Sequence, residues 1–367
     1  MSPVIIMDPL SLALFIEVLV LAGVIGPMHY GANMIRTGRF QQALPVLRAY
    51  YAASHLLPRW RGPMAGFLCA CYVGMGEFVL AQPYAEEAVR ENSKYNYPQH
   101  LASARAHLGI ILIHQGDFDR AGPLIEETLT APIAPRLKQT VELFAANGYI
   151  NLDRLDAADK LIQAILNSSK PTTDVQIVAL ANLSQCRLYQ GRAEEALAAA
   201  RSAAKSKAPN THIRFAVLRG LLVCLTEMNL LEEAQEVAAQ IAPGLNRMDA
   251  FRQGAALRAL AELALKQGDL DRARDYAQRS ATLGVNPNAH ANTLLIQAEV
   301  FAARQNTHRA LTLCRDILET RSVHYYKQRA MELIARLEEP DTLAKSPAKN
   351  YVTATLEETE EQTLTSE

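Results

Sequence analysis

The chain has 367 residues, a mass of 40.4 kDa and a formal net charge of −1. Alanine and leucine supply 107 residues, whereas glycine and proline number only 18 and 17, so we expect an all-α protein without the frequent turns of a sheet protein. Five scattered cysteines exclude a disulfide-stapled scaffold. The nearly balanced charge gives no general attraction to nucleic acid.

The first predicted element is an apolar N-terminal segment, residues 1–28. Between Pro9 and Pro27 the only charged residue is Glu17, and hydrophobic side chains surround the whole helix. A span of about 20 apolar residues crosses a bilayer, and residues 10–28 approach that length. One central carboxylate opposes insertion by about 3 kcal/mol, less than the summed contribution of the apolar residues. We therefore expect a transmembrane segment in which Glu17 is the polar residue.

The flanking charges predict the orientation of this segment. Several arginines follow it and no Lys or Arg precedes it, so the positive-inside rule predicts a single-pass protein of the cytoplasmic membrane with its main body in the cytoplasm. The missing basic leader and small-residue cleavage site argue against a signal peptide. Two alternatives remain: the helix covers the open end of the following domain, or it mediates oligomerisation or partner docking in a soluble regulatory module.

Residues 29–322 contain a repeat with a period of about 38 residues. A turn residue is followed after a few positions by an alanine, and these alanines are separated by 37 to 40 residues: Ala43, Ala81, Ala121, Ala158, Ala196, Ala234, Ala273 and Ala310. In five copies the turn residue is glycine, which leaves a helix readily in the left-handed conformation, and in three it is Asp153, Asn229 or Gln305. Each unit therefore reads as two helices that cross at the alanine.

Two further positions in the first helix of each unit support this interpretation. The position facing the alanine is mostly small: Gly31, Cys69, Gly109, Ala146, Ser184, Leu222, Ala261 and Ala298. The position three residues later is mostly large: Met34, Tyr72, Leu112, Tyr149, Arg187, Leu225, Ala264 and Phe301. This pattern resembles tetratricopeptide repeat (TPR) proteins. The resemblance implies a right-handed superhelical solenoid of about eight helix-turn-helix repeats, and the extra residues per unit are expected in the second helix or in the turn between units.

The layout of an apolar segment before a repeat array also resembles bacterial membrane-anchored TPR scaffolds, although the Cys-x-x-Cys module of some of these proteins is missing. The resemblance implies that partner proteins or peptides bind in the concave groove. The groove candidates are His107, His114, Asn147, Asn151, Asn182, Gln185, Tyr189, Arg219, Arg258, Glu262, Lys266 and Glu299. The lysines of carboxylate-clamp members are missing, so we do not expect recognition of chaperone tails.

No pattern of catalytic residues stands out. The chain has no phosphate-binding glycine loop, nucleophile turn or zinc-binding pair of histidines, and Cys69 and Cys71 fit buried positions of a helix. We expect no enzymatic activity, cofactor, metal or small-molecule substrate. The chain ends with a predicted capping helix, residues 323–338, and an acidic tail, residues 339–367, whose composition is typical of disorder.

Overall fold

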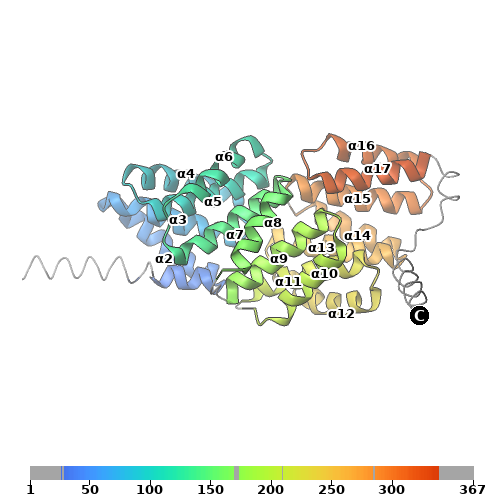
Figure 1. Ribbon diagram of the computed structural model, residues 1–367, viewed down its shortest axis with the longest axis horizontal. Helices are drawn as coiled ribbons and strands as arrows, with labels where there is room; N and C mark the ends of the chain where they lie inside the picture. Colours follow the sequence, from blue (N-terminus) through green and yellow to red (C-terminus); the bar gives the residue numbers. More distant parts are fainter. Residues whose placement is uncertain (1–25, 27–28, 169–172, 209, 284–285, 339–367) are drawn as a thin grey trace, which may run out of the picture.

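The computed structural model describes residues 26, 29–168, 173–208, 210–283 and 286–338, and Figure 1 shows their arrangement. Residues 29–36 are helical, and the elements that follow are α2 (Phe40–Ala53), η1 (Ser54–Leu56), α3 (Pro58–Gly74), α4 (Phe78–Lys94), α5 (Pro98–Gln115), α6 (Phe118–Thr130), α7 (Pro135–Asn151), α8 (Leu155–Leu166), α9 (Thr173–Tyr189), α10 (Ala193–Lys205), α11 (Thr211–Glu227), α12 (Leu231–Ile241), η2 (Ala242–Arg247), α13 (Ala250–Lys266), α14 (Leu270–Ala281), α15 (Pro287–Ala303), α16 (Thr307–Glu319) and α17 (His324–Glu338). The described residues contain no strand.

The predicted membrane segment, including Glu17, and the acidic tail lie outside the described residues. Within the described part, no helix combines the length and the hydropathy needed to cross a bilayer.

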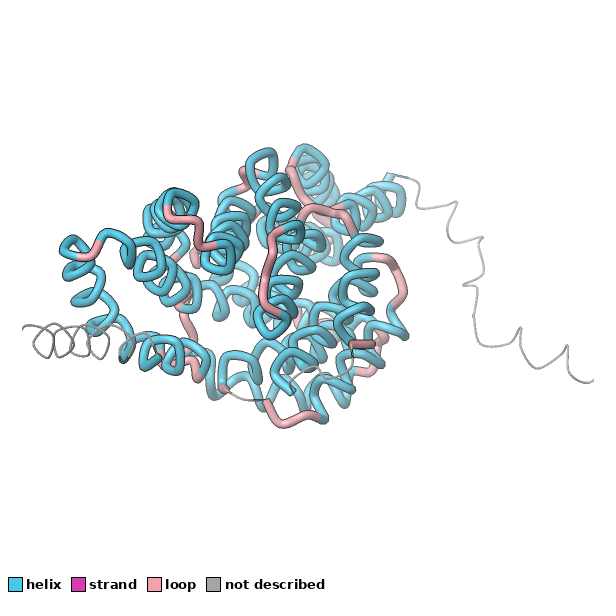
Figure 2. The backbone as a smooth tube through the Cα atoms, turned by 60° about the vertical axis from the view of Figure 1, so that its left-hand side comes forward, coloured by secondary structure: helices cyan, strands magenta, loops and turns pink. Residues whose placement is uncertain are grey.

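The helices form antiparallel pairs that stack one after another (Figure 2). We call the first helix of each pair helix A and the second helix B. From the second unit onward the A helices are α3, α5, α7, α9, α11, α13 and α15, and each contacts the next A helix as well as its own helix B. All eight repeat alanines are 0% exposed, which confirms that they lie where the two helices of a unit cross.

In every unit, one residue of the turn between helix A and helix B has the left-handed backbone conformation. The five turn glycines have φ between 73° and 81°, and the three replacements, Asp153, Asn229 and Gln305, have φ of 62°, 56° and 61°. Asn and Asp adopt left-handed φ values more readily than most other residues. The same turn can therefore form with Asp153 and Asn229 in place of glycine. The prediction of eight equivalent turns is confirmed.

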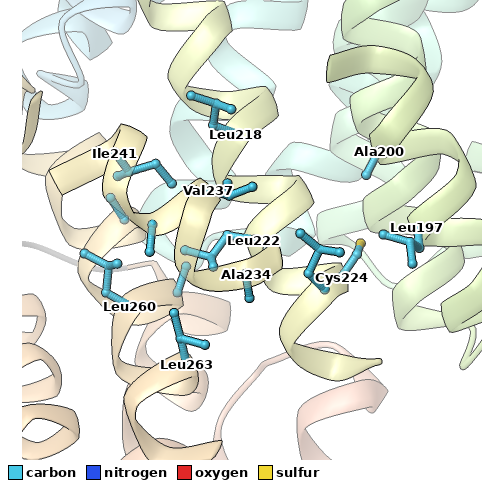
Figure 3. Packing of buried hydrophobic residues seen from close by; sticks show 14 of the residues in the cluster. Leu197, Ala200, Leu218, Leu222, Cys224, Ala234, Val237, Ile241, Leu260 and Leu263 are labelled. Carbon is cyan, nitrogen blue, oxygen red and sulfur yellow. The ribbon is translucent and has the colours of Figure 1, made fainter. Parts of the chain in front are cut away.

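The core consists of several hydrophobic clusters, the larger of which extend across the interfaces between units. Leu218 and Leu222 of α11 meet Val237 and Ile241 of α12, and Leu260 of α13 closes the same cluster (Figure 3). Because every unit buries its apolar stripe against both neighbours, no unit has a complete core of its own.

The lengths of the helices differ from the expectation. From α5 to α16 the A helices have 17 or 18 residues, whereas the B helices have only 11 to 13. Helix B is therefore not the elongated element of the repeat. The last helix, α17, packs against α15 and α16 and covers the end of the array.

The solenoid coils so tightly that its first four units contact its C-terminal units along a seam. We define the seam as the contacts between the A–B turns of units 1 to 4 and the beginnings of α11, α13, α15 and α17. In unit 1 the Gly38 carbonyl lies 3.1 Å from Nε2 of His212, 174 residues later. In unit 2 the Gly74 carbonyl accepts a hydrogen bond from Arg252, 178 residues later.

The seam continues in the next two units with nearly the same spacing. In unit 3 Nδ1 of His114 lies 3.2 Å from Nδ2 of Asn286, and in unit 4 the Asp153 carboxylate accepts a hydrogen bond from the His324 amide, over separations of 172 and 171 residues. One superhelical turn therefore takes between four and five hairpins. Closure of the coil makes the groove a partly enclosed cavity.

Candidate ligand-binding cavity

The inside of the coil contains a cavity of about 380 Å³. Its wall is formed by the A helices α5, α7, α9, α11, α13 and α15, together with residues of α10 and the beginning of α17. This volume lies in the range of about 300–1,000 Å³ that is typical of ligand-binding pockets. The cavity exists because the seam brings α5 and α7 opposite α13 and α15.

One part of the wall is rich in side-chain amides. The asparagines that line the cavity are Asn147, Asn151, Asn182, Asn286, Asn288 and Asn292, and Gln185 lies among them. Asn286 and Asn288 are used by the fold: Asn286 accepts from the amide of Ala289 at the start of α15, and Asn288 accepts from the amide of Val323 while donating to Asn151.

The other amides keep unused hydrogen-bonding capacity within the described structure. Oδ1 of Asn292 is buried and has no hydrogen-bond partner there. Asn182 donates only a long bond of 3.5 Å to the carbonyl of Leu143. Buried amides without partners are unfavourable, and a ligand that supplies both donors and acceptors would satisfy them.

Three tyrosines form an aromatic corner where α9 meets α17. The Tyr189 ring stacks on Tyr325, with centroids 5.2 Å apart, and meets Tyr326 edge-on at 5.7 Å. The hydroxyl oxygens of Tyr189 and Tyr326 are 3.0 Å apart. Burial raises the pKa of Tyr325 and Tyr326, so both hydroxyl groups stay protonated and available as donors at neutral pH.

The charged side chains of the wall are Arg219, Arg252, Arg258 and Glu262. Arg252 is paired with Asp249 at the seam. Burial raises the pKa of the Glu262 carboxyl, and the nearby Arg329 guanidinium opposes that rise. Burial also lowers the pKa of Arg258 to about 10, which still leaves the guanidinium charged at neutral pH.

His114 closes the cavity next to the seam. Its ring stacks on Phe78, with centroids 3.8 Å apart, and Phe251 of α13 contacts it edge-on at 4.8 Å. Burial lowers its pKa to about 3, so the ring is neutral and Nδ1 can accept a hydrogen bond from Asn286.

The structure brings nine of the twelve predicted groove residues together on this wall: His114, Asn147, Asn151, Asn182, Gln185, Tyr189, Arg219, Arg258 and Glu262. They come from five different A helices and line the same cavity.

Three of the predicted groove residues do not line this cavity. His107 is 8% exposed; its Nδ1 lies 2.7 Å from the Ser103 carbonyl and its ring packs against Phe144 between α5 and α7. Lys266 and Glu299 lie at a separate small recess beside Arg329. Glu299 is also held there by an ion pair with Arg336 of α17, at 2.5 Å.

Several wall residues were missed by the sequence analysis. Tyr325 and Tyr326 belong to α17, which was considered only as a cap, and their burial depends on the contact of α17 with α15. Phe215, Phe251 and Asn286 lie near the starts of A helices, which reach the cavity because the coil closes on itself. In the sequence, the two adjacent tyrosines on the predicted terminal helix are the feature that could have indicated a contribution of α17 to the cavity.

We also examined the described residues for metal-ligating groups and for cysteine thiols that are accessible to react. They contain no group of three or more His, Cys, Asp or Glu side chains suited to hold a metal ion. All five cysteines are buried and unpaired, and burial raises the pKa of each thiol, which makes them unreactive as nucleophiles.

No family model matches the sequence, and no curated protein matches it. Among solved structures, the chain is similar to a Rap protein complexed with Competence and Sporulation Factor, with 13% identity over 84% of this chain and 99% of that one, at a TM-score of 0.56.

The fold is of the tetratricopeptide-repeat type. Two further TPR structures cover similar shares of the chain at 13% identity: a TPR protein from Parabacteroides merdae (86% of this chain, 99% of that one, TM-score 0.36) and the P58(IPK) TPR domain (88% and 99%, TM-score 0.28).

Proposed function

We propose that this TPR protein is a protein-interaction scaffold that binds an extended peptide segment of a partner inside the cavity. The observation that carries the proposal is the amide-rich wall, on which Asn182, Gln185 and Asn292 keep hydrogen-bonding capacity that the fold does not use. Side-chain amides offer a donor and an acceptor together, as a peptide group does, so they can pair with an extended backbone of varied sequence. The Rap protein of similar fold is complexed with Competence and Sporulation Factor, which supports a partner-binding role for this chain.

We further propose that residues 10–28 anchor the scaffold in the cytoplasmic membrane, with the repeats in the cytoplasm. The support is the sequence alone: a nearly uncharged apolar run followed by arginines. The rival is a soluble TPR module in which the same segment mediates oligomerisation or docking. No catalytic role is proposed, since the polar groups of the wall are arranged as amides and tyrosines rather than as a nucleophile and base.

Gly220 provides a direct test of binding in the cavity. It lies in the middle of α11, lines the cavity, and a Cβ added to it would meet no atom within 4 Å. A Gly220→Leu side chain would therefore extend into the cavity without a clash, while Gly220→Ala would leave most of the volume free. Both variants are expected to fold, because either residue favours a helix more than glycine does.

The experiment exposes immobilised full-length protein to a pool of random hexapeptides with acetylated and amidated ends, and identifies retained peptides by mass spectrometry. We expect wild type and Gly220→Ala to retain the same peptides and Gly220→Leu to lose them, with equal thermal stability as the control for folding. Equal retention by wild type and Gly220→Leu would place binding outside the cavity.

The anchor has a separate test. Full-length protein expressed in a bacterial host is fractionated, and the membrane fraction is washed with carbonate and then with detergent. Release only by detergent is expected; release by carbonate would favour the soluble module. Glu17→Leu is expected to strengthen retention, because it removes the single charge from the segment.

A further inference from the structure

Arg258 is a cation buried in the cavity wall with one neutral partner. It is 7% exposed, and Nη1 donates a hydrogen bond of 3.0 Å to Oγ of Ser280. No carboxylate of the described residues forms an ion pair with its guanidinium, although the group has five N–H donors. Glu262, one turn further along α13, interacts with it only electrostatically, without an ion pair. Burial of a charge without an opposite charge is strongly unfavourable unless another group compensates for it.

Arg187 shows how the same fold treats a buried arginine that serves structure. It is 8% exposed and pairs with Asp159 at 2.9 Å and with Glu195 at 3.1 Å. Its charge is therefore neutralised by Asp159 of the preceding unit, in α8, and by Glu195 of its own unit, in α10. Arg258 has the same burial but lacks such carboxylates, and it faces the cavity instead.

Among the described residues, the wall contains a second cation without an ion pair, Arg219, in addition to Arg258. Arg219 lines the cavity and takes part in no ion pair within the described structure. Arg252 is neutralised by Asp249, and His114 is uncharged. The one acidic group of the wall, Glu262, also lies at the recess of Arg329, whose guanidinium is ion-paired with Glu227 at 3.5 Å.

We propose that the ligand of this cavity presents a carboxylate to Arg258 and Arg219. The inference rests on the proposed peptide-binding function and specifies the class of peptide: one with an Asp or Glu side chain, or a free C-terminus, next to a segment that pairs with the amides. Arginine forms bidentate hydrogen bonds with carboxylates, so two guanidinium groups that line one cavity and interact electrostatically select an acidic group over its amide.

The carboxylate can come from a partner or from the chain itself. The C-terminal residues Glu357, Glu358, Glu360 and Glu361 form an acidic cluster in the sequence. The test therefore includes a full-length variant in which these four residues are changed to glutamine. Greater retention of acidic peptides by this variant than by wild type assigns the competing carboxylate to the chain's own tail; equal retention assigns the ligand to a partner.

The main experiment compares three pools of random hexapeptides on immobilised full-length protein. The first contains Asp and Glu and has amidated ends, the second replaces Asp and Glu by Asn and Gln, and the third adds only a free C-terminal carboxylate to the second. We expect wild type to retain the first or third pool at least about tenfold better than the second. Arg258→Met should abolish the preference, and Glu262→Gln should preserve or strengthen it. Equal retention of the pools, or an unchanged preference in Arg258→Met, would overturn the inference.

A second measurement, made without any ligand, tests whether Arg258 stabilises the fold. Thermal unfolding is recorded for Arg258→Met and for Arg187→Met, which are substitutions at equally buried sites. We expect Arg187→Met to lower Tm, because it leaves two carboxylates without their partner, and Arg258→Met to leave Tm unchanged or to raise it. An equal decrease in both variants would make Arg258 a structural residue and overturn the inference. If no pool is retained but Tm behaves as expected, the unpaired charge stands and the peptide function fails.

Discussion

His114 of α5 and Phe251 of α13 meet edge-on across the seam, although 137 residues separate them in the chain. This contact joins the third hairpin to the seventh and closes the cavity on one side. Its chemistry requires a neutral imidazole, because the ring lies between two phenyl groups and its Nδ1 accepts from Asn286.

Stability should therefore depend on pH through His114. The unfolded imidazole takes up a proton near pH 6.5, whereas burial lowers the folded pKa to about 3, so the unfolded state binds more protons between these values. Stability is complete above about pH 6.5 and decreases as the pH falls toward 3. Burial lowers the pKa of His107 and His212 as well, so their contributions have the same sign.

The measurement is urea unfolding at pH 7 and pH 4.5 for wild type and His114→Phe, which keeps an aromatic ring at the seam. We expect wild type to lose about 2 kcal/mol more than the variant between these pH values. Identical losses would mean that the ring titrates normally in the folded protein.

The seam can be tested by a pair of glycine substitutions. Gly76 and Gly268 occupy the same turn position with φ of 77° and 78°, so alanine imposes similar backbone strain, about 1 kcal/mol, at both. At Gly76 the new Cβ would also lie 2.8 Å from Asp249 and 2.9 Å from Phe251, whereas at Gly268 it would meet nothing within 4 Å. Gly76→Ala should therefore be the more destabilising variant.

Hydrogen exchange checks where the additional effect of Gly76→Ala arises. We expect faster exchange at the start of α13 in Gly76→Ala and unchanged exchange there in Gly268→Ala. Equal stability of the two variants, with no change at α13, would show that the seam contributes nothing in solution.

The repeat alanines should reject larger side chains. Ala196 is 0% exposed where α9 and α10 cross, and Ala198 is exposed on the same helix α10. Ala196→Leu is expected to lower the free energy of unfolding by about 1–3 kcal/mol through overpacking. Ala198→Leu should change it by less than about 0.5 kcal/mol, as surface substitutions usually do. Chemical denaturation of both variants distinguishes overpacking at Ala196 from a general sensitivity of α10 to larger side chains.

Asn288 should be essential for docking of α17. It is 5% exposed, its Oδ1 accepts from the Val323 amide at 2.8 Å, and its Nδ2 donates to Asn151. Asn288→Leu would leave a buried amide unpaired, so we expect a loss of about 1–3 kcal/mol and faster hydrogen exchange in α17. Asn182→Leu in α9, whose side chain bonds the carbonyl of Leu143 rather than a group of α17, is the control and should affect α17 much less. Equal protection of α17 in both variants would contradict the assignment.

The repeat could be predicted because it is encoded locally. An alanine at each crossing and a left-handed residue at each turn are requirements of one hairpin, so Ala158 and Asp153 could be placed without knowledge of the other units. The orientation of Asn182 and Arg258 toward the inside follows from the same register.

The closed coil could not be predicted in this way. The rotation between neighbouring hairpins depends on many small packing details, and errors in it accumulate over five units before Gly38 reaches His212. For that reason the roles of Tyr326 and Phe251 were missed, and His107 was assigned to the groove although it packs against Phe144.

The regular spacing of the seam also limits how such a chain can change in length. An open solenoid can gain or lose a hairpin anywhere, since each unit contacts only its neighbours. Here a hairpin inserted between Asp153 and His212 would shift all four seam partners by one unit, so that Gly38 and Gly74 would face the wrong helices and the cavity would lose its wall. The number of hairpins between seam partners therefore has to stay constant, and new units can be added without disruption only at the ends of the array.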